Sequence, residues 1–114
     1  MYLARLDGEP VGTIALLWSD EETWGDVPGA AGYVHGLAVR RDFAGQGLGR
    51  ALLRWAENRA ASSGREHLRL DCVAGNRALN EYYEQAGFDH RGHALVRGLE
   101  VSLYEKRIGV FGAG

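Results

Sequence analysis

The stretch "DFAGQGLGRALL" (Asp42–Leu53) carries the strongest fold signal of this sequence. Three glycines, Gly45, Gly47 and Gly49, follow an apolar run and lead into an apolar-periodic segment, which predicts a strand joined to a helix by a glycine turn. The first N–H groups of such a helix have no intrahelical partners, and the helix dipole adds partial positive charge there. Because glycine also lets an anion approach the backbone closely, we expect this turn to bind a pyrophosphate.

Two known phosphate-binding motifs do not fit the turn. The dinucleotide-binding fingerprint requires a glycine three residues after its second one, where this chain has Arg50. The Walker loop requires a lysine, and the stretch contains none. A tight turn that binds no ligand is the other interpretation of these glycines, and the rest of the sequence has to decide between the two.

The remaining pattern predicts a mixed α/β fold (α+β), with strands at 2–6, 11–18, 33–39, 66–73, 88–95 and 99–107 and helices at 48–63 and 76–86. In the resulting order, β-β-β-α-β-α-β-β, the strand-helix-strand crossover gives one central parallel strand pair in a mostly antiparallel sheet. Residues 19–30 combine four carboxylates with glycine and proline and are predicted as a loop. We expect one domain over 1–108 and a flexible tail over 109–114.

Composition limits the partners of this chain. Its 114 residues carry a formal net charge of −2 with Lys and Arg scattered, which favours neither nucleic acid nor a membrane surface. The sequence has no long apolar run and no signal-peptide pattern, so a cytoplasmic location is expected. The single cysteine, Cys72, excludes an internal disulfide, and the spacing of His67, His90 and His93 suggests no metal site.

The order "LAVRRDFAGQGLGRALL", then a strand, then "NRALNEYYEQAGF" resembles the GNAT superfamily of acyl-CoA N-acyltransferases. In that family the loop R/Q-x-x-G-x-G/A binds the pyrophosphate of coenzyme A. A later helix of the form N-x-x-A-x-x-x-Y-x-x-x-G-F supplies an asparagine and a tyrosine. Gly47 and Gly49 match the glycine pair, Asn76 and Tyr83 match the helix, and the resemblance covers about 2–106.

The resemblance implies acetyl-CoA as the cosubstrate and direct transfer of its acetyl group to a primary amine, either a small molecule or a peptide amine. It implies an oxyanion hole made by the backbone of Leu37–Val39. In this chain Ala44 replaces the family's Arg or Gln, so Arg40, Arg41 or Arg50 is the candidate to replace that phosphate contact. The implied coenzyme-binding residues are Leu37, Ala38, Val39, Ala44, Gly45, Gln46, Gly47, Leu48, Gly49, Arg50, Asn76 and Tyr83.

Tyr83 occupies the family's position for the general acid that protonates the leaving thiolate. From spacing alone the same residue reads as a core aromatic on an amphipathic helix. Its neighbour Tyr82 is assigned to packing, although a register error of one residue would exchange the two roles. Cys72 is interpreted as a buried thiol rather than an acylated nucleophile, because the sequence identifies no base for it.

The general base is open at this stage. His35 is one candidate, because an imidazole titrates near neutrality, and strand alternation puts it on the face that carries Leu37 and Val39. Asp71 and Glu22 are other candidates, and direct attack by the amine without a protein base is equally compatible with the sequence.

The acidic loop and the front of the chain concern the acceptor. Asp20, Glu21, Glu22 and Asp26 would attract a cationic acceptor such as a polyamine, unless they are simply solvated. Family members usually place a strand and two helices before this hairpin, so we expect an uncovered apolar flank and a homodimer.

Two alternatives to an enzyme are a non-catalytic acyl-CoA-binding or regulatory module and a self-associating scaffold that has lost the coenzyme.

Overall fold

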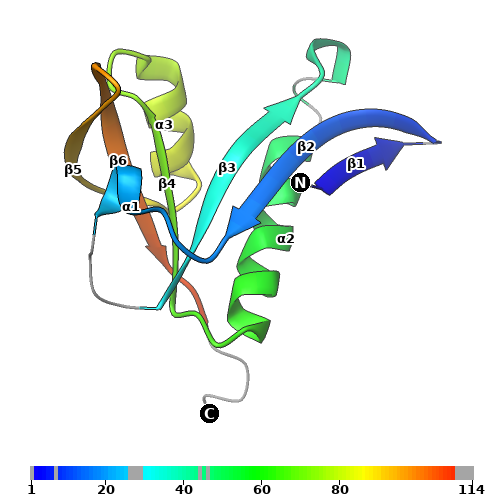
Figure 1. Ribbon diagram of the computed structural model, residues 1–114. Coiled ribbons are helices and arrows are strands. Elements are labelled where there is room, and N and C mark those ends of the chain that lie inside the picture. Colours follow the sequence, from blue (N-terminus) through cyan, green and yellow to red (C-terminus); the bar gives the residue numbers. More distant parts are fainter. Residues whose placement is uncertain (1, 7, 26–29, 44, 46, 110–114) are drawn as a thin grey trace.

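The computed structural model describes residues 2–6, 8–25, 30–43, 45 and 47–109 (Figure 1). Within these ranges the chain forms a single sheet with helices on both of its faces. The strands are β1 (Tyr2–Leu6), β2 (Glu9–Leu17), β3 (Ala31–Val39), β4 (His67–Val73), β5 (Asp89–Val96) and β6 (Leu99–Arg107). The helices are α1 (Glu21–Trp24), α2 (Leu48–Ser62) and α3 (Arg77–Gln85), and a 3₁₀ turn covers Arg41–Phe43.

The strands are arranged in the order β1-β2-β3-β4-β6-β5. β3 and β4 are parallel, and α2 makes the crossover between them, while each of the other neighbouring pairs is antiparallel. The predicted mixed, mostly antiparallel sheet with one central parallel pair is therefore confirmed.

The helix ends follow the predicted signals. α2 is followed by Gly64 with a φ of 78°, a left-handed conformation that glycine adopts without strain. Asn76 caps α3, because its side chain accepts a hydrogen bond from the backbone N–H of Leu79 at 3.1 Å. Gly87, with a φ of 95°, follows the end of α3 as predicted.

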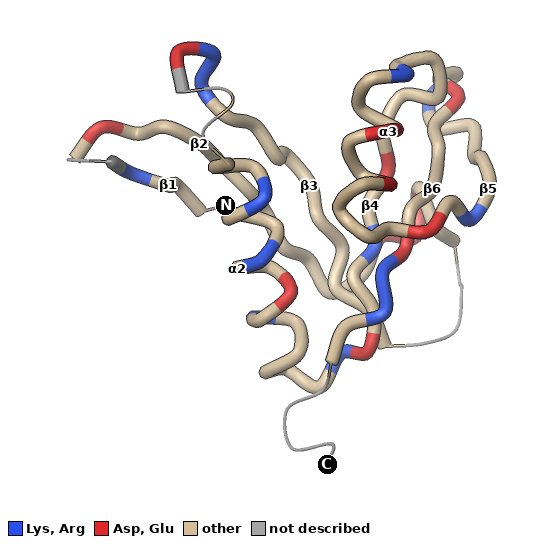
Figure 2. Tube along the Cα trace, turned by 180° about the vertical axis from the view of Figure 1, so that it is seen from behind, with Lys and Arg blue, Asp and Glu red and all other residues tan. Residues whose placement is uncertain are grey.

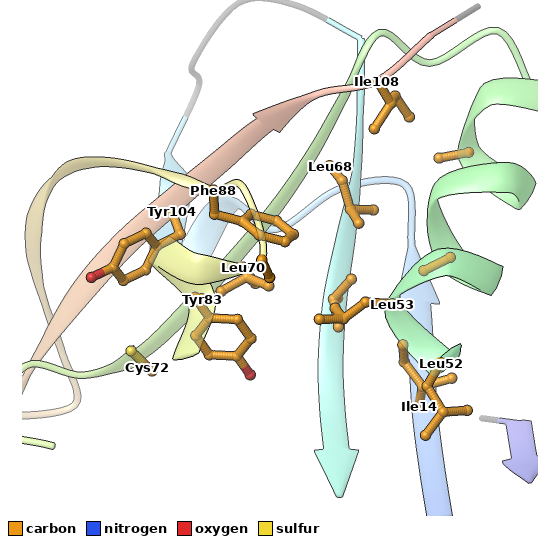
Figure 3. Packing of buried hydrophobic residues seen from close by; sticks show 14 of the residues in the cluster. Ile14, Leu52, Leu53, Leu68, Leu70, Cys72, Tyr83, Phe88, Tyr104 and Ile108 are labelled. Carbon is orange, nitrogen blue, oxygen red and sulfur yellow. The ribbon is translucent and has the colours of Figure 1, made fainter. Parts of the chain in front are cut away.

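The main core lies between the sheet and the helices α2 and α3, which cover the same face (Figures 1 and 3). The predicted alternation along β4 is confirmed, because Leu68, Leu70 and Cys72 enter this core while Arg69 and Asp71 point to the other face. Burying each large apolar side chain stabilises the fold by about 1.5–3 kcal/mol. The larger core residues are Ile14, Val34, Leu52, Leu53, Leu68, Leu70, Tyr83, Phe88, Tyr104 and Ile108.

α1 packs on the opposite face, where a smaller core contains Trp24 and Tyr33. Arg69 is 2% exposed there. Its guanidinium donates hydrogen bonds to Glu105 and to the Tyr33 hydroxyl, both at 2.8 Å, and lies 5.1 Å from the Trp24 ring centroid. This buried ion pair holds β4, β6 and α1 together.

The prediction that residues 19–30 form a loop is partly wrong, because Glu21–Trp24 form the single turn α1. Asp20 caps this turn by accepting a hydrogen bond from the Thr23 N–H at 3.3 Å. Glu21 and Glu22 follow it in the first turn, where their negative charges interact favourably with the positive end of the helix dipole. Burial of Trp24 then stabilises a helix that is too short to form alone.

Charged side chains are spread over the trace, with Lys and Arg interspersed among Asp and Glu rather than gathered on one element (Figure 2). This distribution agrees with the absence of a basic block in the sequence. None of the helices in the described part of the chain is both long and apolar enough to cross a membrane.

Candidate active site

The glycine turn ends in an exposed helix N-terminus. Gly45 and Gly47 have φ values of 81° and 76°, in the left-handed region that favours glycine, and Gly47 is the N-cap of α2. The N-cap makes no side-chain hydrogen bond, and the first intrahelical bond runs from Ala51 N–H to the Gly47 carbonyl. The backbone N–H groups before Ala51 are therefore available to an anion. Ala44 and Gln46, which were predicted to bind the coenzyme, lie outside the described residues.

A cavity of about 360 Å³ opens directly beside this N-terminus. It is bounded by the end of β3, the glycine turn, the start of α2 and one side of α3. A Cβ on Gly45 or Gly47 would meet no atom within 4 Å, so both residues leave open space for a ligand. The lining residues are Leu37, Ala38, Val39, Gly45, Gly47, Leu48, Gly49, Arg50, Leu79, Tyr82 and Tyr83.

β3 contains a bulge where it borders this cavity. The register with β2 shifts, so that Gly36 and Leu37 together lie opposite Ile14. Gly36 has a φ of 60°, and its carbonyl accepts a hydrogen bond from the Thr13 hydroxyl at 2.9 Å. One extra residue in a strand reverses the alternation of the side chains that follow it.

The bulge overturns one prediction, that His35 shares a face with Leu37 and Val39. Leu37 and Val39 pack against the main core, as Val34 does. His35 instead lies on the face of α1, where its Nε2 is 2.8 Å from Oδ2 of Asp20. Simple alternation failed here because it assumed a regular strand.

β3 and β4 pair over a short stretch and then separate. The register joins Ala31–Tyr33 to His67–Arg69, and beyond it the two strands diverge (Figures 1 and 2). A second cavity, of about 350 Å³, lies between the separated strands. Its lining residues are Val34, His35, Gly36, Leu37, Leu70, Asp71, Cys72, Val73, Leu79, Tyr83, Leu99 and Val101.

The two cavities share Leu37, Leu79 and Tyr83. The second cavity also has lining residues on both faces of the sheet, since Leu70 faces the main core and Asp71 faces away from it. A molecule in the first cavity could therefore meet, at Tyr83, a molecule that enters from the α1 face.

Tyr83 is 6% exposed and packs among aromatic rings. Its ring centroid lies 6.0 Å from those of Phe88 and Tyr104 and 5.4 Å from that of Tyr82. Burial, with smaller contributions from Cys72, Tyr82 and Asp71, raises the pKa of Tyr83 to about 12. The phenol is therefore protonated at neutral pH and can act as a hydrogen-bond or proton donor.

Tyr82, unlike Tyr83, lines the first cavity but not the second. Its hydroxyl packs directly against Gly49 at the start of α2. Burial raises its pKa, while the positive charge of Arg50 lowers it. Because Tyr83 and not Tyr82 borders both cavities, the geometry favours the register in which Tyr83 is the candidate acid.

A cluster of His35, Asp20 and Asp71 borders the second cavity on the α1 side. One ligand atom from each of the three residues lies within 4.8 Å of the others. Burial raises the pKa of Asp71, His35 lowers it, and Asp20 raises it further. The pairing of Asp20 with His35 was not predicted, because the two residues are joined by the position of α1 and not by any spacing in the sequence.

Cys72 lines the same cavity but is a poor nucleophile. Its thiol is buried, and burial, followed by the charges of Asp71 and Glu84, raises its pKa to about 11. Since the thiolate is the reactive form, this agrees with the interpretation of Cys72 as a packing residue.

Four predicted candidates, Asn76, Glu22, Arg40 and Arg41, line neither of the two cavities. Asn76 caps α3 and does not line the first cavity. Glu22 accepts hydrogen bonds from Arg97 at 2.6 and 3.3 Å on the exposed side of α1, outside the second cavity. Arg40 pairs with Glu9 and Asp42. Of the three candidate arginines, Arg40, Arg41 and Arg50, only Arg50 is among the described residues that line the first cavity. The predicted acidic residue Asp26 lies outside the described residues.

Comparison with known proteins identifies the family. The model of the acetyltransferase (GNAT) family matches residues 1–88. The chain is also 38% identical to YesJ, an uncharacterized N-acetyltransferase of Bacillus subtilis (strain 168), over 95% of this chain and 61% of YesJ. This chain therefore spans about three fifths of the length of that relative.

Solved structures share the fold. An acetyltransferase of the GNAT family from Listeria monocytogenes 4b F2365 has a TM-score of 0.75 and 28% identity, over 89% of this chain and 59% of that chain. A GNAT family acetyltransferase from Elizabethkingia anophelis with acetyl-CoA bound has a TM-score of 0.73 and 17% identity, over 93% and 74% of the two chains. The family match covers more than half of the residues and includes the glycine turn and α3, so this chain belongs to the acetyltransferase (GNAT) family.

Proposed function

We propose that this protein transfers an acetyl group from acetyl-CoA to a primary amine by direct attack of the amine. The observation that carries the proposal is the meeting of two cavities at Tyr83. The first cavity lies at an uncapped helix N-terminus, which suits a pyrophosphate, and the second contains His35 and Asp71, which suit an amine.

The first cavity is the proposed coenzyme site. Acetyl-CoA would supply a thioester-activated acetyl group. The N–H groups at the start of α2 and the side chain of Arg50 would hold its phosphates, and Gly45 and Gly47 leave room for them. The relative from Elizabethkingia anophelis, which has acetyl-CoA bound, supports this assignment through the shared fold.

The end of β3 would stabilise the charge that develops on the thioester oxygen. A bulge leaves an extra residue out of the regular hydrogen-bond ladder, and here the bulge is at Gly36 and Leu37. The backbone N–H groups of Leu37–Val39 border the first cavity and are the proposed donors. Each donor of this kind contributes on the order of 3 kcal/mol to transition-state stabilisation.

Two side chains would move protons. The Tyr83 hydroxyl donates to the sulfur as the carbon–sulfur bond breaks, and the raised pKa of Tyr83 keeps its proton in place until then. Burial of the leaving thiolate raises the pKa of the conjugate thiol, which favours this transfer. His35 would accept the proton that the amine loses as its nitrogen bonds to the acetyl carbon.

The first test is thermal melting of the purified protein with acetyl-CoA, coenzyme A and ATP. A ligand at about one hundred times its Kd adds roughly 2.7 kcal/mol to the stability of the folded state. We expect both coenzyme forms to raise the melting temperature and ATP to have little effect. No shift with either form would favour the scaffold that has lost the coenzyme.

The second test measures thiol release from acetyl-CoA with a panel of small and peptide amines. Amine-dependent release, together with an acetylated product of the correct mass, is the expected result. Coenzyme binding without turnover on the whole panel would favour the acyl-CoA-binding module.

The expected homodimer and the cytoplasmic location stay predictions. Light scattering at micromolar concentration checks whether the protein is a dimer.

A further inference from the structure

We infer that Asp20 is a positioning residue that fixes the tautomer of His35, so that Nδ1 of His35 is the basic nitrogen offered to the acceptor amine. The inference rests on the proposed function for its consequence on turnover. The geometry that carries it is the short contact between Nε2 of His35 and Oδ2 of Asp20, at 2.8 Å.

Asp20 is held in place by both of its carboxylate oxygens. Oδ1 accepts a hydrogen bond from the Thr23 N–H and so caps α1, while Oδ2 lies against His35. The side chain of Asp20 is 10% exposed. α1 is in turn anchored by the burial of Trp24, and its Glu22 accepts the two hydrogen bonds from Arg97 in the β5–β6 hairpin. The carboxylate therefore approaches His35 from a fixed direction.

This contact determines which imidazole nitrogen is basic. An ionised carboxylate accepts hydrogen bonds and cannot donate them, so the nitrogen that faces Asp20 must carry a proton. In neutral His35 that nitrogen is Nε2, and Nδ1 then holds the lone pair. His35 lines the second cavity, so an acceptor amine bound there would meet the side chain that carries this Nδ1 lone pair.

The charges around His35 support the same role. Asp20 approaches it from the N-cap of α1 and Asp71 from β4, and Tyr83 and Cys72 line the cavity from the core side. Free alkylamines arrive mainly as ammonium ions at neutral pH. The carboxylate of Asp71 gives such a cation a counter-charge beside His35. The ammonium ion loses its first proton to solvent, and the neutral amine attacks. The second proton, which the nitrogen loses as it bonds to the acetyl carbon, is the one that Nδ1 of His35 accepts.

Asp20→Asn is the decisive variant, because an asparagine keeps the shape of the side chain. Its amide oxygen can still cap α1, but its NH₂ group would then face His35 and requires an acceptor there. The expected result is a switch of His35 to the tautomer with the proton on Nδ1. Asp71→Asn removes a neighbouring charge without touching the 2.8 Å contact, so it should leave the tautomer unchanged.

The tautomer can be measured by long-range ¹H–¹⁵N NMR of the imidazole, at a pH where the nitrogen shifts show the ring to be neutral. The protein has 4 histidines, and His35→Gln assigns the signal of interest. We expect the Nε2–H form in the unaltered protein and the Nδ1–H form in Asp20→Asn. The Nδ1–H form in the unaltered protein, or no change in Asp20→Asn, would overturn the inference.

Turnover gives the second readout. Asp20→Asn should lower kcat at least about 100-fold, the usual contribution of a general base, with the Kd for acetyl-CoA unchanged. Asp89→Asn, the same change at an exposed aspartate on β5 that lines neither cavity, is the matched control and should keep full activity. A switched tautomer with unchanged kcat would show that the positioning of His35 by Asp20 does not contribute to turnover. If no amine is acetylated even by the unaltered protein, the proposed function fails, while the NMR result still decides whether Asp20 positions His35.

Discussion

The phenol oxygen of Tyr82 lies 2.5 Å from the position that a Cβ atom on Gly49 would occupy. This contact joins α3 to the first turn of α2, and both elements border the first cavity. The glycine at this position is therefore required by a close approach of a side chain and not by an unusual backbone angle. The shape of the proposed coenzyme site depends on it.

We predict that Gly49→Ala pushes Tyr82 toward the first cavity and weakens acetyl-CoA binding about tenfold, with a loss of stability of about 1 kcal/mol from overpacking. In a Tyr82→Phe background the nearest ring atom, Cζ, is 3.5 Å from the added carbon, which is an ordinary contact. There Gly49→Ala should be neutral or slightly stabilising, because alanine favours a helix by roughly 1 kcal/mol over glycine. Calorimetry and melting of the four proteins measure the coupling, and additive effects would contradict the prediction.

Tyr83→Phe should lower kcat by about 100-fold or more, because it removes the proposed proton donor without removing the ring. Acetyl-CoA affinity should change little. Burial raises the pKa of Tyr83 to about 12, so the hydroxyl stays protonated throughout the neutral range, and the fall in kcat caused by its deprotonation should appear only at alkaline pH, above about pH 10. Tyr82→Phe is the matched control one residue away, and a larger loss of kcat in that variant would move the acid role to Tyr82.

The sequence predicted the sheet and the two longer helices well, because their signals are local. Alternating residues marked β4, and Asn76, Gly64 and Gly87 marked helix ends by capping and by left-handed backbone angles. The glycine turn was placed correctly at the start of α2 for the same reason. In these elements the residue type itself sets the local conformation.

The site was less predictable, because it depends on contacts between distant segments. The bulge at Gly36 arises from pairing with β2, and it moved His35 to the face opposite Leu37. α1 is stabilised because Trp24 is buried against Tyr33, and the position of α1 brings Asp20 into contact with His35. A candidate histidine could be found from the sequence, but its partner could not.

Cys72 should react slowly with thiol reagents in the folded protein. Its pKa rises from a usual value of 9.0 to about 11, so at about pH 8 the thiolate fraction falls roughly a hundredfold. The rate of iodoacetamide labelling, followed by mass spectrometry, should therefore increase with pH up to about 11. Denaturant should restore the rate of an ordinary cysteine, and fast labelling of the native protein at neutral pH would revive Cys72 as a candidate nucleophile.

Arg69 and Arg77 provide a comparison of one type of ion pair at two depths. Arg69 is 2% exposed and donates to Glu105, whereas Arg77 is 91% exposed and donates to Glu81 one helical turn away. We predict that Arg69→Gln lowers the free energy of unfolding by about 3–5 kcal/mol, because Glu105 loses its buried partner. Arg77→Gln should cost less than about 0.5 kcal/mol, as expected for an exposed pair. Urea unfolding monitored by tryptophan fluorescence measures both values. Similar losses of stability in the two variants would show that the Arg69–Glu105 pair is not the contact that holds α1, β4 and β6 together.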